Sequence, residues 1–115
     1  MAARFLQTGG WRILRRNYRA QGGGEVDLVC RDGNMLVFAE VKTRTSDSHG
    51  RPMDAVNAEK EQLIIRGAIS WLKLLDNNDV PYRFDIVEVI LKDGERPHVN
   101  VVENAFQLPE VYRFN

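Results

Sequence analysis

The stretch of residues 24–44 constrains the fold more than any other part of the chain. It contains two apolar runs, residues 26–30 and 35–41, which are separated by Asp32-Gly33-Asn34. Runs of this length that are rich in Val and Leu and joined by such a turn are typical of a β-hairpin. Because the runs are largely apolar rather than alternating, we expect both faces of the sheet to be covered.

Three charged residues, Asp27, Glu40 and Lys42, interrupt this apolar hairpin. Burying a charge is costly unless the charge is paired or bound to a metal, so these residues require an explanation. Strand alternation places Glu25 and Asp27 on one face, and likewise Glu40 and Lys42. A lone Glu-x-Lys is usually a solvated face or a simple ion pair, but here it ends an apolar strand that runs beside Asp27.

Two registers of the hairpin bring the carboxylates together. If Gly33-Asn34 is the two-residue loop, Asp27 lies opposite Glu40. If Asp32-Gly33 is the loop, Asp27 faces Phe38 and lies diagonal to Glu40. Either register makes Asp27 and Glu40 neighbours on one face.

Two neighbouring carboxylates repel each other unless one is protonated or a cation lies between them. Hard oxygen ligands with no nearby His or Cys suit Mg²⁺ or Mn²⁺ better than zinc. Lys42 points to the same place, where it could orient a water, help to deprotonate it or stabilise charge on a phosphate.

The same residues carry a resemblance to known nucleases. Asp27, twelve intervening residues and Glu40-Val41-Lys42 match the signature of the restriction-endonuclease-like, or PD-(D/E)xK, superfamily. The wider pattern resembles the YraN-like family of uncharacterised bacterial proteins, which is similar to archaeal-type Holliday-junction resolvases. The segments that carry this second resemblance are residues 10–19, 24–29, 36–44, 55–56, 60 and 83–87.

The resemblance implies a set of site residues. Asp27 and Glu40 would hold Mg²⁺ or Mn²⁺ together with the Val41 carbonyl, and Lys42 would be catalytic. Accessory roles fall to Glu25 and Lys60, and phosphate contacts fall to Arg12, Arg15, Arg16, Arg44 and Lys60. Family members have a longer first helix with a Gly-Glu pair upstream of residues 2–6. We therefore expect either a native start upstream or a site with one carboxylate fewer.

Charge is distributed unevenly along the chain. The net charge is zero, but residues 1–24 contain five arginines and no acidic residue, which leaves eleven basic and sixteen acidic residues in the remainder. A basic arm beside an acidic metal site suits a phosphodiester enzyme. The arginines could equally protect an exposed edge strand from aggregation.

The remaining segments predict a single α/β domain over residues 1–115. We expect a short helix at 2–8, a first strand at 11–19, and a main helix from an N-cap at Asn57 to about residues 76–78. A right-handed crossover then leads to a parallel strand at 82–91. A last strand at 99–103 and a tail that folds back form a C-terminal extension. The order helix, three strands, helix, strand is that of the restriction-endonuclease-like mixed sheet.

Cellular setting and activity follow as expectations. No apolar run is long enough to cross a membrane, no signal-peptide pattern opens the chain, and Cys30 is the single cysteine, so we predict a cytoplasmic protein. We expect a metal-dependent nuclease acting on DNA, including branched DNA, with a homodimer suggested by analogy. The alternatives are an inactive nucleic-acid-binding module that retains the fold, and a structural protein whose charged trio is an ion-pair network.

Overall fold

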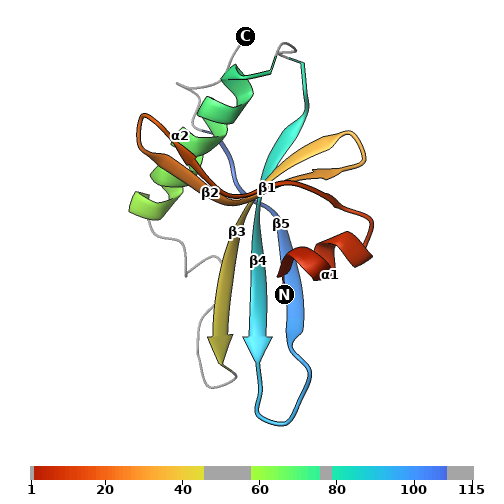
Figure 1. Ribbon diagram of the computed structural model, residues 1–115. Helices are drawn as coiled ribbons and strands as arrows, with labels where there is room; N and C mark the ends of the chain where they lie inside the picture. Colours follow the sequence, from red (N-terminus) through yellow and green to blue (C-terminus); the bar gives the residue numbers. More distant parts are fainter. Residues whose placement is uncertain (1, 46–57, 76–78, 109–115) are drawn as a thin grey trace.

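The computed structural model describes residues 2–45, 58–75 and 79–108. The elements follow in the order α1 (Ala2–Thr8), β1 (Arg12–Ala20), β2 (Gly24–Asp32), β3 (Met35–Thr45), α2 (Ala58–Lys73), β4 (Tyr82–Leu91) and β5 (His98–Phe106). The strands form one sheet in the order β1-β2-β3-β4-β5 (Figure 1). This mixed α/β architecture confirms the predicted order, and β5 belongs to the C-terminal extension. No described helix has the length and apolar character needed to span a bilayer.

The central hairpin adopts the first of the two predicted registers. Cys30 pairs with Val37 and Asp32 pairs with Met35, which makes Gly33-Asn34 the two-residue loop. Gly33 has a φ of 61°. A positive φ at the first loop position is what the tight hairpin turns require, and glycine adopts it without steric cost.

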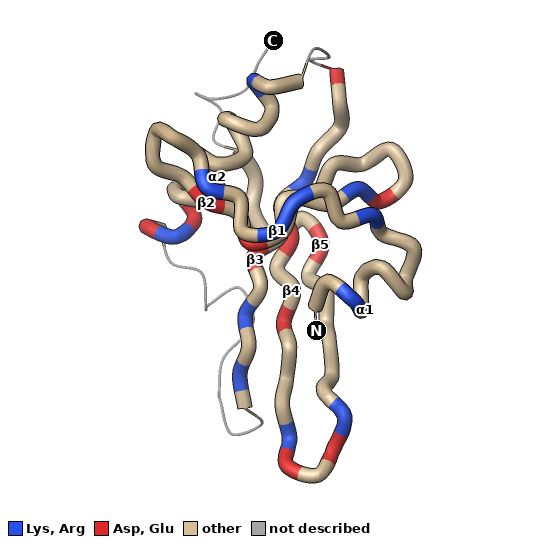
Figure 2. Tube along the Cα trace, in the orientation of Figure 1, with Lys and Arg blue, Asp and Glu red and all other residues tan. Residues whose placement is uncertain are grey.

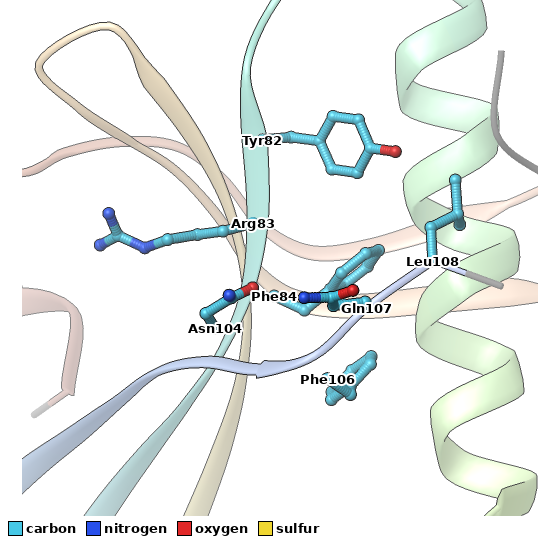
Figure 3. Close-up of a pocket in the computed structure, with 7 residues that line it drawn as sticks. All are labelled: Tyr82, Arg83, Phe84, Asn104, Phe106, Gln107 and Leu108. Atoms are coloured by element: carbon cyan, nitrogen blue, oxygen red, sulfur yellow. The ribbon is translucent and has the colours of Figure 1, made fainter. Parts of the chain in front are cut away.

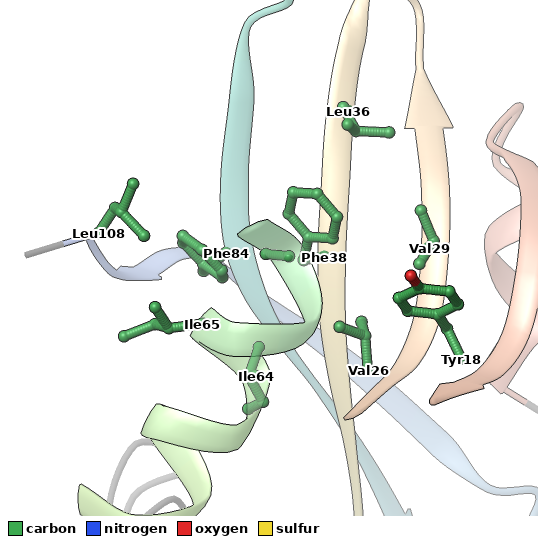
Figure 4. Close-up of a cluster of buried hydrophobic side chains, with 10 residues drawn as sticks. Tyr18, Val26, Val29, Leu36, Phe38, Ile64, Ile65, Phe84 and Leu108 are labelled. Atoms are coloured by element: carbon green, nitrogen blue, oxygen red, sulfur yellow. The ribbon is translucent and has the colours of Figure 1, made fainter. Parts of the chain in front are cut away.

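Both faces of the sheet are covered, as the apolar runs predicted. On one face, the stripe of α2 formed by Ile64, Ile65 and Ala68 packs on strand residues that include Phe38 and Phe84 (Figure 4). On the other face, α1 contributes a smaller cluster of Ala2, Ala3, Leu6 and their strand neighbours Leu28, Cys30, Val37, Ala39, Val87 and Val89. Cys30 is therefore a small buried hydrophobe.

Two glycines allow α2 to approach β2 closely. A Cβ on Gly24 would lie 2.5 Å from the backbone nitrogen of Gly67, and a Cβ on Gly67 would lie 2.9 Å from Val26 Cγ2. Real Cβ atoms do not tolerate such contacts, so the helix and the strand meet through bare backbone. Gly67 is therefore a packing position of α2.

The crossover from β3 through α2 returns to a parallel strand, as expected. Every residue of β3 from Leu36 to Thr45 has a partner in β4. The helix ends at Lys73, earlier than predicted, and Leu74 and Leu75 continue it only as i→i−3 turns. The predicted N-cap Asn57, the loop with His49, the helix end at 76–78 and the tail beyond Leu108 lie outside the described residues. Within them, the start of the tail does fold back, because Leu108 is buried in the α2-side core.

A β-bulge between β4 and β5 is organised by a buried acid. The pairing shifts between Phe84 and Ile86, and Asn104 in the bulge has a φ of 54°. Asp85, which is fully buried, accepts a hydrogen bond from the Asn104 backbone N–H at 2.9 Å, and its two oxygens share the Nε–H of Arg83 at 2.9 and 3.0 Å. Burial raises the pKa of Asp85, and these donors offset part of that desolvation. Because the donors tie the carboxylate to the bulge, we assign this network to folding rather than chemistry.

Candidate active site

The candidate site lies where β2 and β3 separate. Their regular pairing runs from Asp32 opposite Met35 to Leu28 opposite Ala39 and is not recorded beyond that pair. Extending the same register by one residue sets Asp27 against Glu40. The two carboxylates therefore lie at the fork of the hairpin, just beyond the last regular pair, and the charge of Asp27 acts on Glu40.

The Asp27 side chain of β2 is hydrogen-bonded to the backbone of β3 at this fork. Its Oδ2 accepts a hydrogen bond from the Val41 N–H at 2.9 Å. This bond fixes the orientation of the carboxylate and satisfies an amide that has lost its ladder partner. The N–H and C=O of a strand residue point to the same neighbour, so the Val41 carbonyl is also directed towards the Asp27 side.

Glu40 is a buried carboxylate with an unsatisfied oxygen. Glu40 is only 2% exposed, and its Oε2 has no hydrogen-bond partner within the described part of the chain. Burial, and then the neighbouring charge of Asp27, raise the pKa of Glu40 to about 7, although Lys60 and Lys42 oppose the shift. An orphaned buried oxygen beside a second carboxylate is the environment that a divalent cation would stabilise.

Two lysines approach Glu40 from different elements. Lys42 Nζ lies 3.8 Å from Glu40 Oε1, and Lys60 Nζ, from the first turn of α2, lies 3.5 Å from the same oxygen. Lys60 also donates a hydrogen bond to Glu25 Oε1 at 2.8 Å. That bond lowers the pKa of Glu25 and raises the pKa of Lys60. The structure thus brings Lys60 close to Glu40, and it sets Glu25 against Lys60.

The donor set suits a hard cation with few protein ligands. Among the described residues, no three His, Cys, Asp or Glu side chains are close enough to form a metal cluster. Mg²⁺ is commonly held by one or two carboxylates and completes its shell with waters and substrate phosphates. Asp27, Glu40 and the Val41 carbonyl fit this pattern, whereas they do not fit a closed structural site.

The site opens towards the α1 side of the sheet. Strand alternation fails around Asp27, because Val26 packs in the α2-side core whereas Leu28 packs in the α1-side cluster. In β1, Asn17 lies between the residues paired with Leu28 and Val26 and has a φ of 51°. A hollow of about 460 Å³ on the α1 side is lined by Ala2, Ala3, Arg16, Asn17, Asp27 and Val41, among others. Asp27 is therefore accessible from the face opposite to α2.

The predicted phosphate-contact residues fall into separate groups. Arg12, Arg15 and Arg16 are exposed on β1, which is an edge strand. This position is compatible with phosphate contact and also with protection of the edge from aggregation. Arg44 Nε instead lies 2.9 Å from the buried carboxylate of Glu88 on the neighbouring strand β4. Figure 2 shows these basic segments along β1 and at the end of β3.

Sequence reasoning assigned no role to the two acids within β4. Glu88 is opposite Lys42 in the parallel register and pairs with Arg44, so it extends the charged cluster by one strand. A charged residue inside an apolar strand indicated that Glu88 needs a partner, but only the register of β3 and β4 identifies that partner as Arg44.

The hollow of about 200 Å³ beside β4 is separate from the candidate site. Its lining, which includes Tyr82, Phe84 and Phe106, is aromatic and contains none of the predicted site residues (Figure 3).

Comparisons with known proteins agree with the resemblance seen in the sequence. Residues 1–89 match the model of the uncharacterised protein family UPF0102. A UPF0102 protein of Geobacter metallireducens is 40% identical over 94% of this chain and 87% of its own length. Those of Trichlorobacter lovleyi and Symbiobacterium thermophilum are 42% and 43% identical, over 93% and 91% of this chain and 84% and 88% of their own lengths. The chain therefore belongs to the UPF0102, or YraN-like, family.

Proposed function

We propose that this protein is a divalent-metal-dependent nuclease that hydrolyses phosphodiester bonds in DNA. The observation that carries the proposal is the proximity of Asp27 to the buried, incompletely satisfied carboxylate of Glu40, where β2 and β3 separate. The resemblance of Asp27, Glu40 and Lys42 to the nuclease signature supports the same reading.

Asp27, Glu40 and the Val41 carbonyl would hold the cation, Mg²⁺ or Mn²⁺. When bound, such a cation lowers the pKa of a coordinated water and stabilises negative charge on a phosphate. The hydrogen bond from the Val41 N–H holds Asp27 in place, and burial keeps the Glu40 side chain in one position. These two constraints preorganise the ligands before any substrate arrives.

The lysines would provide the positive charge that phosphodiester cleavage needs. Lys42 borders Glu40 and keeps about a third of its side chain exposed, so it can reach a water or a phosphate oxygen. Lys60 lies deeper and is held by Glu25, which makes it a fixed charge beside the carboxylates. Arg44 would contact phosphate only after leaving Glu88, whereas Arg12, Arg15 and Arg16 are exposed on the edge strand.

A second candidate function is a DNA-binding module without turnover. It is favoured by Lys60, whose ammonium already lies 2.8 Å from Glu25 and 3.5 Å from Glu40 and so supplies a built-in cation. In this case the ion pairs of Lys60 with Glu25 and Glu40 would stabilise the fork of the hairpin. DNA binding would then depend on the basic edge strand β1. A homodimer, which would present two basic arms to one branched DNA, is compatible with either candidate.

Cleavage assays separate the two candidates. Wild type should cut at least one of branched, linear or single-stranded DNA in Mg²⁺ or Mn²⁺, and Glu40→Gln should lose that activity. Asp93→Asn, which neutralises an exposed carboxylate after β4, is the matched control and should cleave as wild type does. Binding of DNA without cleavage of any form in either metal would favour the binding module.

A further inference from the structure

We propose that a groove on the α1 side of the sheet binds an unpaired strand of DNA and leads it to the candidate site. The groove consists of two hollows that share Arg16, and it is referred to below as the α1 groove. This inference rests on the proposed nuclease function, because it specifies which DNA would be presented to Asp27 and Glu40.

The two hollows join the candidate site to a basic surface. The first, of about 460 Å³, contains Asp27 and Val41 of the site and is bordered by Arg16. The second, of about 770 Å³, is lined by Arg4, Phe5, Gln7, Arg16, Arg96, Pro97 and Val99. It lies between α1, β1 and the start of β5, and Figure 1 shows α1 beside β5 on this side of the molecule. A ligand in the second hollow would therefore pass Arg16 to reach Asp27.

The charge of the second hollow suits a polyanion. Three arginines, Arg4, Arg16 and Arg96, contribute to its walls, and no carboxylate does so among the described residues. None of the three forms an ion pair with another residue in the described ranges. The nearest acid in sequence, Glu95, has its carboxylate 3.7 Å from His98 Nε2. Arginines that are not neutralised by neighbouring acids are available to phosphates.

The exposed ring of Phe5 favours an unpaired strand over a duplex as the ligand of the α1 groove. Phe5 is 47% exposed, although it lies on a helix that buries Ala2, Ala3 and Leu6. An exposed aromatic residue in a hollow that arginines also line is an arrangement on which unpaired bases stack while the backbone contacts the cations. In a duplex the base faces are already stacked on each other, so Phe5 can be used only by a base that is unpaired.

Binding measured without cleavage tests this inference. The probes are a labelled oligo-dT 12-mer, a blunt duplex, and the same duplex with a single-stranded tail, all in EDTA and followed by fluorescence anisotropy. Phe5→Ala should weaken binding of the 12-mer and the tailed duplex by about 5- to 100-fold, the loss expected for one stacked base. Binding of the blunt duplex should change less than about twofold, and Phe5→Trp should bind the 12-mer as wild type does.

The arginines are tested through the salt dependence of the same binding. Arg4→Gln with Arg96→Gln should lower the slope of log affinity against log salt by about 1.4 for the 12-mer, since each contact to a single strand contributes about 0.7. A control away from the groove is Lys73→Gln with Leu74→Ala, which removes one charge and one exposed apolar side chain at the far end of α2. This control should leave both the affinity and the slope unchanged.

The outcomes separate this inference from the proposed function. An absence of binding to the 12-mer by wild type, or equal losses for the 12-mer and the blunt duplex in Phe5→Ala, would overturn the α1 groove even if the protein cleaves DNA. Selective losses in Phe5→Ala and in the arginine pair would support the groove even if no cleavage is found. In that case the binding module, rather than the nuclease, would use it.

Discussion

Neutralising Glu40 should stabilise the metal-free protein at alkaline pH, although the change removes a charge that two lysines contact. Burial and the charge of Asp27 together outweigh those lysines, so the pKa of Glu40 lies at about 7 rather than at its ordinary value of 4.5. Below about pH 4.5, Glu40 is protonated in both the folded and the unfolded chain. As the pH rises through 7, the folded chain must ionise a buried group, and stability is lost.

The size of this effect follows from the two pKa values. Raising a carboxyl pKa from 4.5 to about 7 corresponds to roughly 3 kcal/mol of unfolding free energy between the two pH limits. Glu40→Gln imitates the protonated form and should therefore be about 3 kcal/mol more stable than wild type at pH 8.5. At pH 4.5 the two proteins should be nearly equal. Asp27→Asn should reduce the pH dependence in part, because it removes the second cause of the shift.

Urea unfolding at pH 4.5, 6.5 and 8.5 in EDTA measures these differences. Asp93→Asn serves as the control, since an exposed carboxylate should show no comparable gain. A Glu40→Gln variant that is less stable than wild type at pH 8.5 would show that the pairs with Lys42 and Lys60 dominate. A gain that does not depend on pH would refute the assignment of the effect to ionisation.

Three further variants test separate parts of the molecule. Lys42→Ala should lower turnover by roughly two to four powers of ten without a change in melting temperature, and Lys42→Arg should not restore full activity; a large loss of melting temperature at full specific activity would contradict this role. Replacing Arg15 and Arg16 by Gln should lower the salt slope for duplex DNA by about 1.8, and an unaltered slope would mean that they only protect the edge strand. Gly67→Ala should cost about 1–3 kcal/mol in urea unfolding, because its Cβ would lie 2.9 Å from a side-chain carbon of β2, whereas Gly22→Ala, in open space, should cost little.

Local patterns predicted the fold well. The Val- and Leu-rich runs around Gly33-Asn34 fixed the hairpin, and only the register remained to be chosen between two possibilities. The main helix predicted after Asn57 and the strand predicted at 82–91 implied the parallel crossover, which the structure contains. The proximity of Asp27 to Glu40 was predicted from the same register, because strand pairing converts sequence spacing into proximity, although the regular pairing stops one residue short of them.

What the sequence could not predict depends on departures from regular geometry and on contacts distant in the chain. The change of face at Asp27, which opens the site to the α1 side, accompanies the positive φ of Asn17 on another strand. Arg44 pairs with Glu88, 44 residues away, and this pair becomes visible only from the register of β3 and β4. The bulge at Asn104, held by Asp85, likewise breaks the alternation on which strand predictions rest.

Calorimetric titration with Mn²⁺ tests the proposed cation site most directly. Wild type at pH 8 should bind one Mn²⁺ per chain, and both Asp27→Asn and Glu40→Gln should weaken that binding by at least about tenfold, since each removes one of two anionic ligands. Asp93→Asn should bind as wild type does. Binding that is unchanged in both site variants, or no binding by wild type, would contradict a metal site at the fork of the hairpin.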